Sequence, residues 1–391
     1  MFAVFKSARK GINLVFLLFS AVIVAACQAP TMRSGPTINT SNPVPVALLI
    51  PGESASAGDN IIARSLENAA RLAIADLDGV QIDLRVYNTA GQADRAAAVA
   101  RTAVDDGAKI IIGPLYGQSA NAAGVALSGT NVNILAFSNQ PSIAGGNVFV
   151  LGNTFENTAD RIVSYATQRG LRDVMIVHGA DNVSEAAGRD ALLRSASNYG
   201  ANVTGVSSFE MSQQGVINAV PAIARDAQSS GAQAILFASG TEGALPLLTQ
   251  LLPENGVSPS TTQFIGLTRW DIPSATLALP GVQNGWFALP DPSLSSAYAS
   301  RYQASFGEAP HPISGLAYDG IAAIGALVRG GNSNALTKSA LTQSSGFAGV
   351  NGAFRLLPDG TNQRGLAIAQ IQQNQVIVID PAPRSFSGSG F

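Results

Sequence analysis

The chain has 391 residues, with 23 lysines and arginines against 25 aspartates and glutamates, one cysteine and two histidines. A net charge of −2 offers no basic surface for nucleic acid, one cysteine excludes an internal disulfide and multi-cysteine metal sites, and two histidines leave little for histidine-based catalysis. We therefore expect no metal, no cofactor and no nucleic-acid partner, and the length predicts about two globular domains.

The first 26 residues have the pattern of a secretory signal peptide. Three basic residues, Lys6, Arg9 and Lys10, precede an apolar run that ends at Ala26. This run is shorter than the roughly 20 residues that span a bilayer comfortably. The pattern favours a cleaved signal, and the alternative is an N-terminal membrane anchor.

The signal ends in Val24-Ala25-Ala26-Cys27, which resembles the lipobox of bacterial lipoproteins. The resemblance implies that Cys27 is acylated and anchors the protein to a membrane; the alternative is an incidental cysteine. Because Gln28 follows instead of aspartate, it further implies the periplasmic side of an outer membrane. Residues 27–43, rich in proline, serine, threonine and asparagine, predict a flexible tether.

Beyond the tether, short apolar runs alternate with amphipathic stretches. The first block is predicted as strand 46–50, helix 61–77, strand 82–87, helix 93–105, strand 110–112, a helix opening near residue 118, and strands 132–137 and 148–151. The second block is predicted as helix 157–168, strand 174–177, helix 185–199, strand 203–209, helix 216–227, strand 234–237, helix 244–252 and strand 263–267. This alternation predicts an α/β fold with two doubly wound lobes.

The last third of the chain has a different pattern. Helices are predicted over 293–306 and 313–328, followed by alternating strands over 346–357, 366–372 and 375–379. Asp359-Gly360 is typical of a hairpin turn. The Gly/Ser-rich residues 385–391 predict a disordered tail.

Several stretches together resemble the type I periplasmic binding proteins, the fold of leucine- and branched-chain amino-acid receptors. They are Ile110 through Gly113-Pro114-Leu115-Tyr116, Ile134 through Phe137-Ser138, Ala317-Tyr318-Asp319-Gly320, and Phe347-Ala348-Gly349 with Asp359-Gly360. The resemblance implies two lobes joined by three crossovers, near residues 153–156, 284–286 and 345–347. Lobe one would comprise 44–153 plus 286–345, and lobe two 154–285 plus 346–384.

In open α/β sheets, ligands bind outside the carboxyl ends of the strands. The candidate residues for such a ligand or partner cleft are Tyr116, Gln118, Ser119, Ser138 and Asn139 on lobe one, and Arg269, Trp270 and Asp271 on lobe two. Two interpretations of Arg269, Trp270 and Asp271 stay open. Either Trp270 offers an apolar face beside an arginine that clamps an anion, or Arg269 pairs with Asp271 while Trp270 packs under the loop. Tyr116, similarly, either lines the cleft or packs at a helix start.

Amino-acid receptors of this family hold the ligand ammonium with an acid. By alignment that acid falls near Thr268 here and is followed by Arg269, which disfavours an amine. Enzyme motifs are also missing from the sequence: there is no Gly-x-Ser-x-Gly elbow, no Walker A loop and no dinucleotide-binding glycine motif after the first strand. His178 and His311 are interpreted as structural. We therefore expect a non-enzymatic binding protein.

A closer resemblance links the chain to penicillin-binding protein activators. It rests on the lipobox, Gly113-Pro114-Leu115, Ala136 through Asn139, Gly266 through Asp271, and Pro381 through Phe386. It implies a docking module that regulates peptidoglycan synthesis by contacting a peptidoglycan synthase. The alternative function is a substrate-binding receptor of an ABC transporter for an amino acid or related small anionic solute, held by Ser119, Ser138 and Arg269.

Overall fold

The structure is a computed structural model that describes residues 35–386, and the chain from Gly35 onward forms one compact unit. The predicted signal peptide, Cys27 and the first part of the tether lie outside the described residues. None of the helices in the described part is long and apolar enough to cross a membrane.

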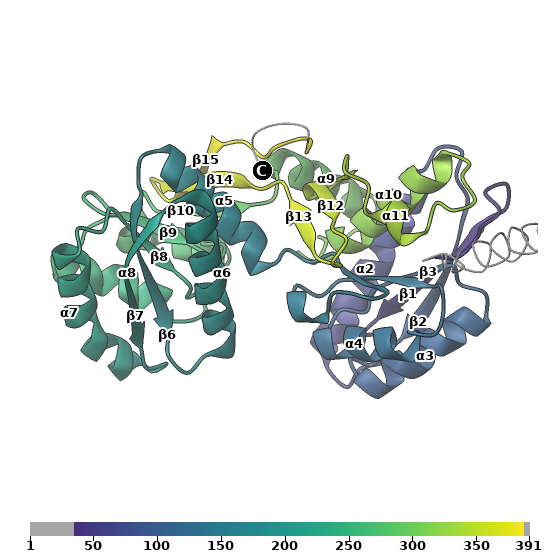
Figure 1. The fold of residues 1–391 in the computed structure, drawn as a ribbon, viewed down its shortest axis with the longest axis horizontal. Helices are drawn as coiled ribbons and strands as arrows, with labels where there is room; N and C mark the ends of the chain where they lie inside the picture. Colours follow the sequence, from purple (N-terminus) through teal and green to yellow (C-terminus); the bar gives the residue numbers. More distant parts are fainter. Residues whose placement is uncertain (1–34, 387–391) are drawn as a thin grey trace, which may run out of the picture. The chain divides into compact units, whose positions relative to one another are not determined.

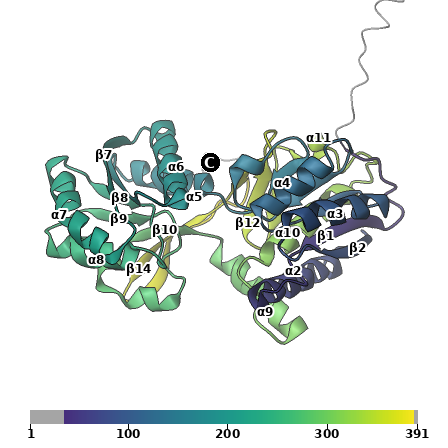
Figure 2. The same cartoon turned by 90° about the horizontal axis from the view of Figure 1, so that it is seen from below.

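The first lobe is built on a parallel five-stranded sheet in the order β2-β1-β3-β4-β5. Alternate residues of a strand face opposite sides of its sheet. Val46 and Leu48 accordingly pack in the core with α2 and α10 (Gly315–Arg329), whereas Ala47 and Leu49 pack with α3 and α4. The two pairs of helices cover opposite faces of this sheet (Figures 1 and 2). The elements are β1 (Val44–Ile50), α2 (Ala57–Ala75), β2 (Ile82–Asn88), α3 (Ala93–Asp105), β3 (Ile110–Ile112), α4 (Gly117–Ala126), β4 (Asn133–Ala136), η1 (Pro141–Ile143) and β5 (Val148–Val150).

The second lobe contains a seven-stranded sheet in the order β15-β14-β10-β9-β8-β6-β7. The five strands from β10 to β7 are parallel to one another, β14 pairs antiparallel with β10, and the edge strand β15 pairs antiparallel with β14. Helices α5 and α6 pack on one face, and α7 and α8 on the other. The elements are α5 (Phe155–Gln168), β6 (Asp173–Gly179), α6 (Val183–Tyr199), β7 (Asn202–Phe209), α7 (Gln213–Ser229), β8 (Ala234–Phe237), α8 (Leu245–Glu254), β9 (Gln263–Gly266), η2 (Ser274–Ala278), η3 (Pro280–Val282), β10 (Trp286–Leu289), β14 (Ala367–Gln372) and β15 (Gln375–Asp380).

Between β10 and β14 the chain returns to the first lobe. A small antiparallel sheet, β11-β12-β13, packs there with α10, and Phe347 and Phe354 join the same core as β1. The elements of this return are α9 (Pro292–Phe306), α10 (Gly315–Arg329), α11 (Lys338–Leu341), β11 (Phe347–Gly349), β12 (Gly352–Leu356) and β13 (Asn362–Arg364).

Capping side chains fix several helix starts. Ser56 accepts a hydrogen bond from the backbone N–H of Asp59 at 3.4 Å, so α2 begins at Ala57, four residues before its predicted start. Thr154 accepts from the backbone N–H of Asn157 at 3.3 Å and starts α5 immediately after the first crossover. Caps lie outside the apolar periodicity, which explains why periodicity placed α2 late.

The predicted α/β class is confirmed, and the predicted strands and helices overlap the observed ones. The lobe boundaries differ at two places. Trp286–Leu289 forms β10 within the second sheet, because Phe287 fills that lobe's core, so the chain leaves the second lobe after residue 289. Phe347–Arg364 belongs with the first lobe, because its phenylalanines complete the core over α10, so the third crossover falls near residue 365.

Two segments predicted to be flexible are partly packed. Ile38, within the predicted tether, is only 6% exposed and joins the first-lobe core, and its N–H donates to the carbonyl of Ser333. At the other end, the Phe386 ring lies 4.7 Å from the guanidinium carbon of Arg355. In both places one apolar side chain outweighs the polar composition around it.

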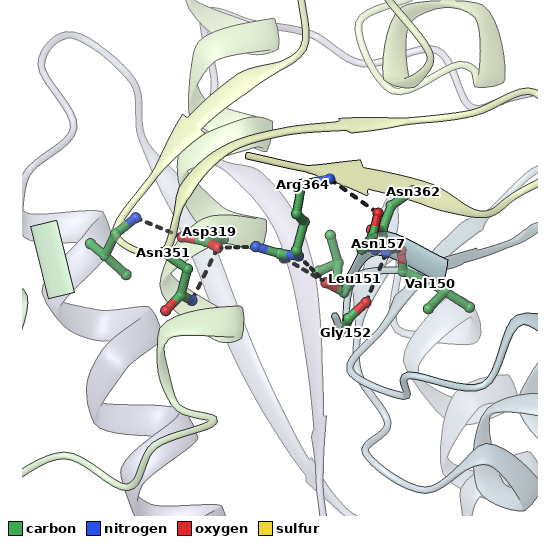
Figure 3. Close-up of polar contacts among 9 residues, drawn as sticks. Val150, Leu151, Gly152, Asn157, Asp319, Asn351, Asn362 and Arg364 are labelled. Carbon is green, nitrogen blue, oxygen red and sulfur yellow. Dashed lines mark hydrogen bonds and ion pairs between the residues drawn. The ribbon is translucent and has the colours of Figure 1, made fainter. Parts of the chain in front are cut away.

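A buried polar network joins the first and third crossovers (Figure 3). The amide of Asn362 donates to the carbonyls of Val150 and Gly152 at 2.7 and 2.9 Å and accepts from the Asn157 amide at 2.7 Å. These direct hydrogen bonds pair buried polar groups of two segments that lie about two hundred residues apart in sequence. The network holds the chain's entry to the second lobe against its final return to that lobe.

Arg364 extends this network into the first lobe. Its guanidinium donates twice to the carbonyl of Leu151 and pairs with Asp319 at 3.1 Å, and the two charged side chains are 3% and 0% exposed. Burial raises the pKa of Asp319, while Arg364 and donors from Val350 and Asn351 oppose that rise. Arg364 therefore ties α10 to both crossovers.

Asp319→Asn is expected to lower the free energy of unfolding by about 3–5 kcal/mol, because it leaves the Arg364 guanidinium buried without a counter-charge. Urea denaturation followed by circular dichroism measures the change. The control is Glu308→Gln, which removes the partner of Arg64 from an exposed pair and is expected to cost at most about 1 kcal/mol. Similar losses in the two variants would contradict the importance of the buried pair.

Candidate ligand-binding site

A cavity of about 500 Å³ lies where the carboxyl ends of β3 and β4 meet loops that follow β9 and β10. These strand ends are where an open α/β sheet binds ligands. The cavity is lined by Ile62, Leu115, Tyr116, Gly117, Phe137, Ser138, Asn139, Gln140, Gly152, Asn153, Arg269, Ile272, Pro290, Pro312, Ile313, Leu316, Asn351, Arg364 and Leu366. Both lobes contribute, and the walls are mainly apolar.

The loop after β3 brings Tyr116 to the cavity. Gly113 precedes it at a φ of 87°, and a Cβ there would lie 2.1 Å from the Leu49 carbonyl oxygen, so this turn requires glycine. The Tyr116 hydroxyl donates to Asp59 Oδ1 at 2.5 Å, and Ser54 donates to the other oxygen of that carboxylate. Partial burial and the Asp59 carboxylate raise the pKa of Tyr116 to about 12, so its phenol stays protonated at physiological pH.

Other residues predicted for the first-lobe side of the site divide into two groups. Ser138 is buried at the cavity wall and accepts from the Gln140 N–H at 3.1 Å, so its own proton is available to a ligand, and Asn139 lies beside it. Ser119 is buried away from the cavity on α4, with its hydroxyl 3.5 Å from the Gly91 carbonyl. Gln118 is exposed and does not line the cavity.

The loop after β9 adopts the second of the two arrangements considered for it. Arg269 lines the cavity and pairs with Asp271 through Nε at 2.8 Å and through Nη2. Trp270 is fully buried in the second-lobe core, 6.3 Å from the Phe237 ring centroid. The prediction that Trp270 lines a cleft is therefore wrong. Its indole removes more apolar surface from water by packing beneath the loop than by lining a cleft.

A smaller cavity of about 140 Å³ adjoins the first and shares Asn153, Arg269 and Pro290 with it. Thr268 also lines this side chamber, and its Oγ1 is buried without a hydrogen-bond partner among residues 35–386. A buried hydroxyl of this kind is unfavourable unless something pairs with it. The side chamber thus offers an unused polar group next to Arg269.

Sequence analysis missed the residues that come from the third crossover and from α10. Arg364, Leu366 and Leu316 line the cavity although they lie far from the predicted loops in sequence. No local motif marks them, and only the third crossover brings them there. His178, by contrast, is buried with Nδ1 2.8 Å from the Gly179 carbonyl, which fits the structural role expected for it.

Potential metal ligands do not cluster here: within the described residues no group of three or more histidine, cysteine or acidic side chains could hold a metal ion. The polar groups available at the cavity are hydroxyls, amides and the Arg269 guanidinium, because the guanidinium of Arg364 is already bonded to Leu151 and Asp319. Such a set recognises a solute by hydrogen bonds and leaves the apolar walls to contribute affinity.

Gly266→Ala is expected to lower the free energy of unfolding by about 1–3 kcal/mol, because its added carbon would lie 2.0 Å from Nε1 of the buried Trp270. Urea denaturation again measures the loss. The matched control is Gly129→Ala, where a Cβ would meet nothing within 4 Å, and the expected change is within about 0.5 kcal/mol. A neutral Gly266→Ala would contradict the buried position of Trp270.

Comparisons with known proteins agree with this geometry. A family model described as periplasmic binding protein matches residues 43–375. Among solved structures, a putative branched-chain amino acid ABC transporter from Rhodospirillum rubrum is 18% identical, with a TM-score of 0.73 over 86% of this chain and 100% of that one. An ABC transporter substrate-binding protein from Desulfitobacterium hafniense, in complex with Leu, is 14% identical, with a TM-score of 0.63 over 86% and 100%.

A solute binding protein of an ABC transporter from Rhodopseudomonas palustris BisB5, in complex with 3,4-dihydroxy benzoic acid, is 16% identical, with a TM-score of 0.58 over 89% of this chain and 99% of that one. No curated protein matches the chain. At these identities the structural likeness shows a shared fold, and the family match covers most of the sequence. The chain therefore belongs to the periplasmic binding protein family, whose members are non-enzymatic solute-binding proteins of the periplasm.

Proposed function

We propose that the protein is the substrate-binding receptor of an ABC transporter and that it binds a small solute in the cavity of about 500 Å³. That cavity carries the proposal. Its volume falls within the range of roughly 300–1,000 Å³ that is usual for small-molecule sites, and its apolar walls carry a few polar groups, as such sites do.

The contribution of both lobes to the walls supports a receptor role. Leu115 and Ser138 come from the first lobe, Arg269 and Ile272 from the second, and Arg364 from the crossover between them. A solute held by all three favours whichever arrangement of the lobes gives it the most contacts. Differential contact of this kind is how a binding protein signals that it is loaded.

The solved relatives described above support the same function. One was crystallised with Leu and another with 3,4-dihydroxy benzoic acid, and both are described as components of ABC transporters. None of the solved structures described above is a penicillin-binding protein activator. A protein-docking module for a peptidoglycan synthase also needs no lined solute cavity. The receptor function is therefore preferred over the activator function.

Ile313→Trp is expected to abolish solute binding, because an indole at this partly buried lining position would occupy space that the solute needs. Thermal shift against amino acids, amides, carboxylic acids and cell-wall fragments measures binding. A ligand at a hundred times its dissociation constant adds about 2.7 kcal/mol of stability. The control is Val125→Trp, since Val125 is 67% exposed and lies outside the cavity lining. A screen without any hit, or binding retained by Ile313→Trp, would contradict the receptor function.

We further propose that Cys27 is lipidated and tethers the receptor to the outer membrane, as the lipobox resemblance implies. Cys27→Ser is expected to move the protein from the membrane fraction to the soluble periplasmic fraction, because no acyl chain is then attached. Cell fractionation with mass spectrometry of the N-terminal peptide measures both changes. An unacylated Cys27 in the wild-type protein would contradict the proposal.

A further inference from the structure

The charged side chains that line the two adjoining cavities are all positive. Arg269 and Arg364 line the main cavity, and no aspartate or glutamate lines either it or the side chamber in the part of the chain described. Three carboxylates contact lining residues from outside the cavity, and each is already paired: Asp59 with Tyr116, Asp271 with Arg269, and Asp319 with Arg364. A ligand ammonium would therefore lose its hydration without gaining a carboxylate partner.

Arg269 is held so that one side of its guanidinium stays available. Asp271 occupies Nε and Nη2, and Nη1 makes no hydrogen bond within residues 35–386. The Asp271 side chain is 14% exposed and lines neither cavity, whereas Arg269 lines both. A guanidinium has five N–H groups in a planar fork, so a carboxylate bound on the Nε side leaves donors at the other end for a second carboxylate.

Thr268 supplies a second donor at the same place. Its buried Oγ1 has no partner in the described part of the chain, and it lines the side chamber together with Arg269. The hydroxyl oxygen itself lies below the accessible surface, so the Thr268 side chain must rotate about its Cα–Cβ bond before a ligand oxygen in this chamber can pair with the hydroxyl and the guanidinium together. In the main cavity, beyond the residues that it shares with the side chamber, the side chains of Ile313, Leu316 and Leu366 are purely hydrocarbon.

We propose that the site selects a small apolar carboxylate that carries no amino group. Its carboxylate is held in the side chamber by Arg269 and Thr268, and its hydrocarbon lies in the main cavity. Asp271 is a positioning residue that orients Arg269. This inference rests on the proposed receptor function and narrows its ligand class, because an amine finds hydrogen-bond acceptors but no counter-charge here.

Isothermal titration calorimetry on the purified protein tests the ligand class with two matched series. One comprises 4-methylpentanoate, leucine and 3-methylbutylamine; the other comprises 3-phenylpropanoate, phenylalanine and 2-phenylethylamine. We expect at least one acid to bind, about tenfold or more tighter than its amino acid, with no detectable binding of either amine. An amino acid or amine that binds more tightly than its matched acid would overturn the inference and leave the receptor function standing.

The wider thermal-shift panel separates the remaining outcomes. If all six compounds fail and the panel yields a ligand with an amino group, the inference is wrong and the receptor function holds. If the panel yields an apolar acid of another shape, the inference holds. If nothing binds in either experiment, the receptor function fails, and the inference fails with it.

Two substitutions that are expected to change the affinity for the acid in opposite directions test the role of Arg269. Arg269→Gln is expected to weaken binding of the acid about ten- to a hundredfold, because a charge-assisted hydrogen bond is lost. Asp271→Asn is expected to strengthen it, because the amide oxygen still accepts from Nε while the competing negative charge is removed. If the ion pair served only to hold the loop, both variants would weaken binding alike, and that result would overturn the inference.

Thr268→Val provides a variant that breaks no ion pair. It replaces the unpaired hydroxyl with a methyl group of similar size, so the thermal midpoint should be equal to that of the wild type or higher. Acid affinity should nevertheless fall about fivefold or more. Unchanged acid affinity in a folded Thr268→Val protein would remove Thr268 from the site and contradict the proposed position of the carboxylate.

Discussion

Arg364 and Asp319 place opposite charges where almost no water reaches them, and this pair constrains the molecule around it. Each charge would be costly if buried alone, so the two segments that carry them must meet with little freedom. The guanidinium also donates to the Leu151 carbonyl at the first crossover. Helix α10, the first crossover and the third crossover are thereby fixed against one another, and the cavity walls that come from all three are fixed with them.

The site built on this support combines hydrocarbon walls with cations whose counter-charges lie outside the cavity. Each arginine is paired with a carboxylate, Arg364 with Asp319 and Arg269 with Asp271. The Arg269 guanidinium still has donors for a ligand, whereas no carboxylate of residues 35–386 lines the cavity. Specificity in such a site depends on which ligand leaves a buried group unpaired. An acid satisfies donors that are already present, whereas an amine requires an acceptor charge that the cavity lacks.

Much of the architecture follows from patterns that are local in sequence. The run Val46 to Ile50 is apolar throughout because both faces of β1 are covered by helices, and the alternation of such runs with amphipathic helices predicts a parallel sheet. Strand β10 escaped prediction because its four residues begin at the second predicted crossover, near residues 284–286, and are too few to show a period. Ile38 and Phe386 show the same limit, since single apolar side chains inside polar segments carry no periodicity.

The sequence by itself determined the α/β class, the two-lobed organisation and the strand ends at which Tyr116, Ser138 and Arg269 meet the cavity, because hydrophobic period and chain order are local properties that fix which edge of a sheet a loop occupies. Only the tertiary structure decided that Trp270 is core, that Asp271 holds Arg269, and that Arg364 and Leu366 complete the walls. The physical reason is that burial and charge pairing depend on neighbours supplied by distant segments, and three crossovers bring those neighbours together.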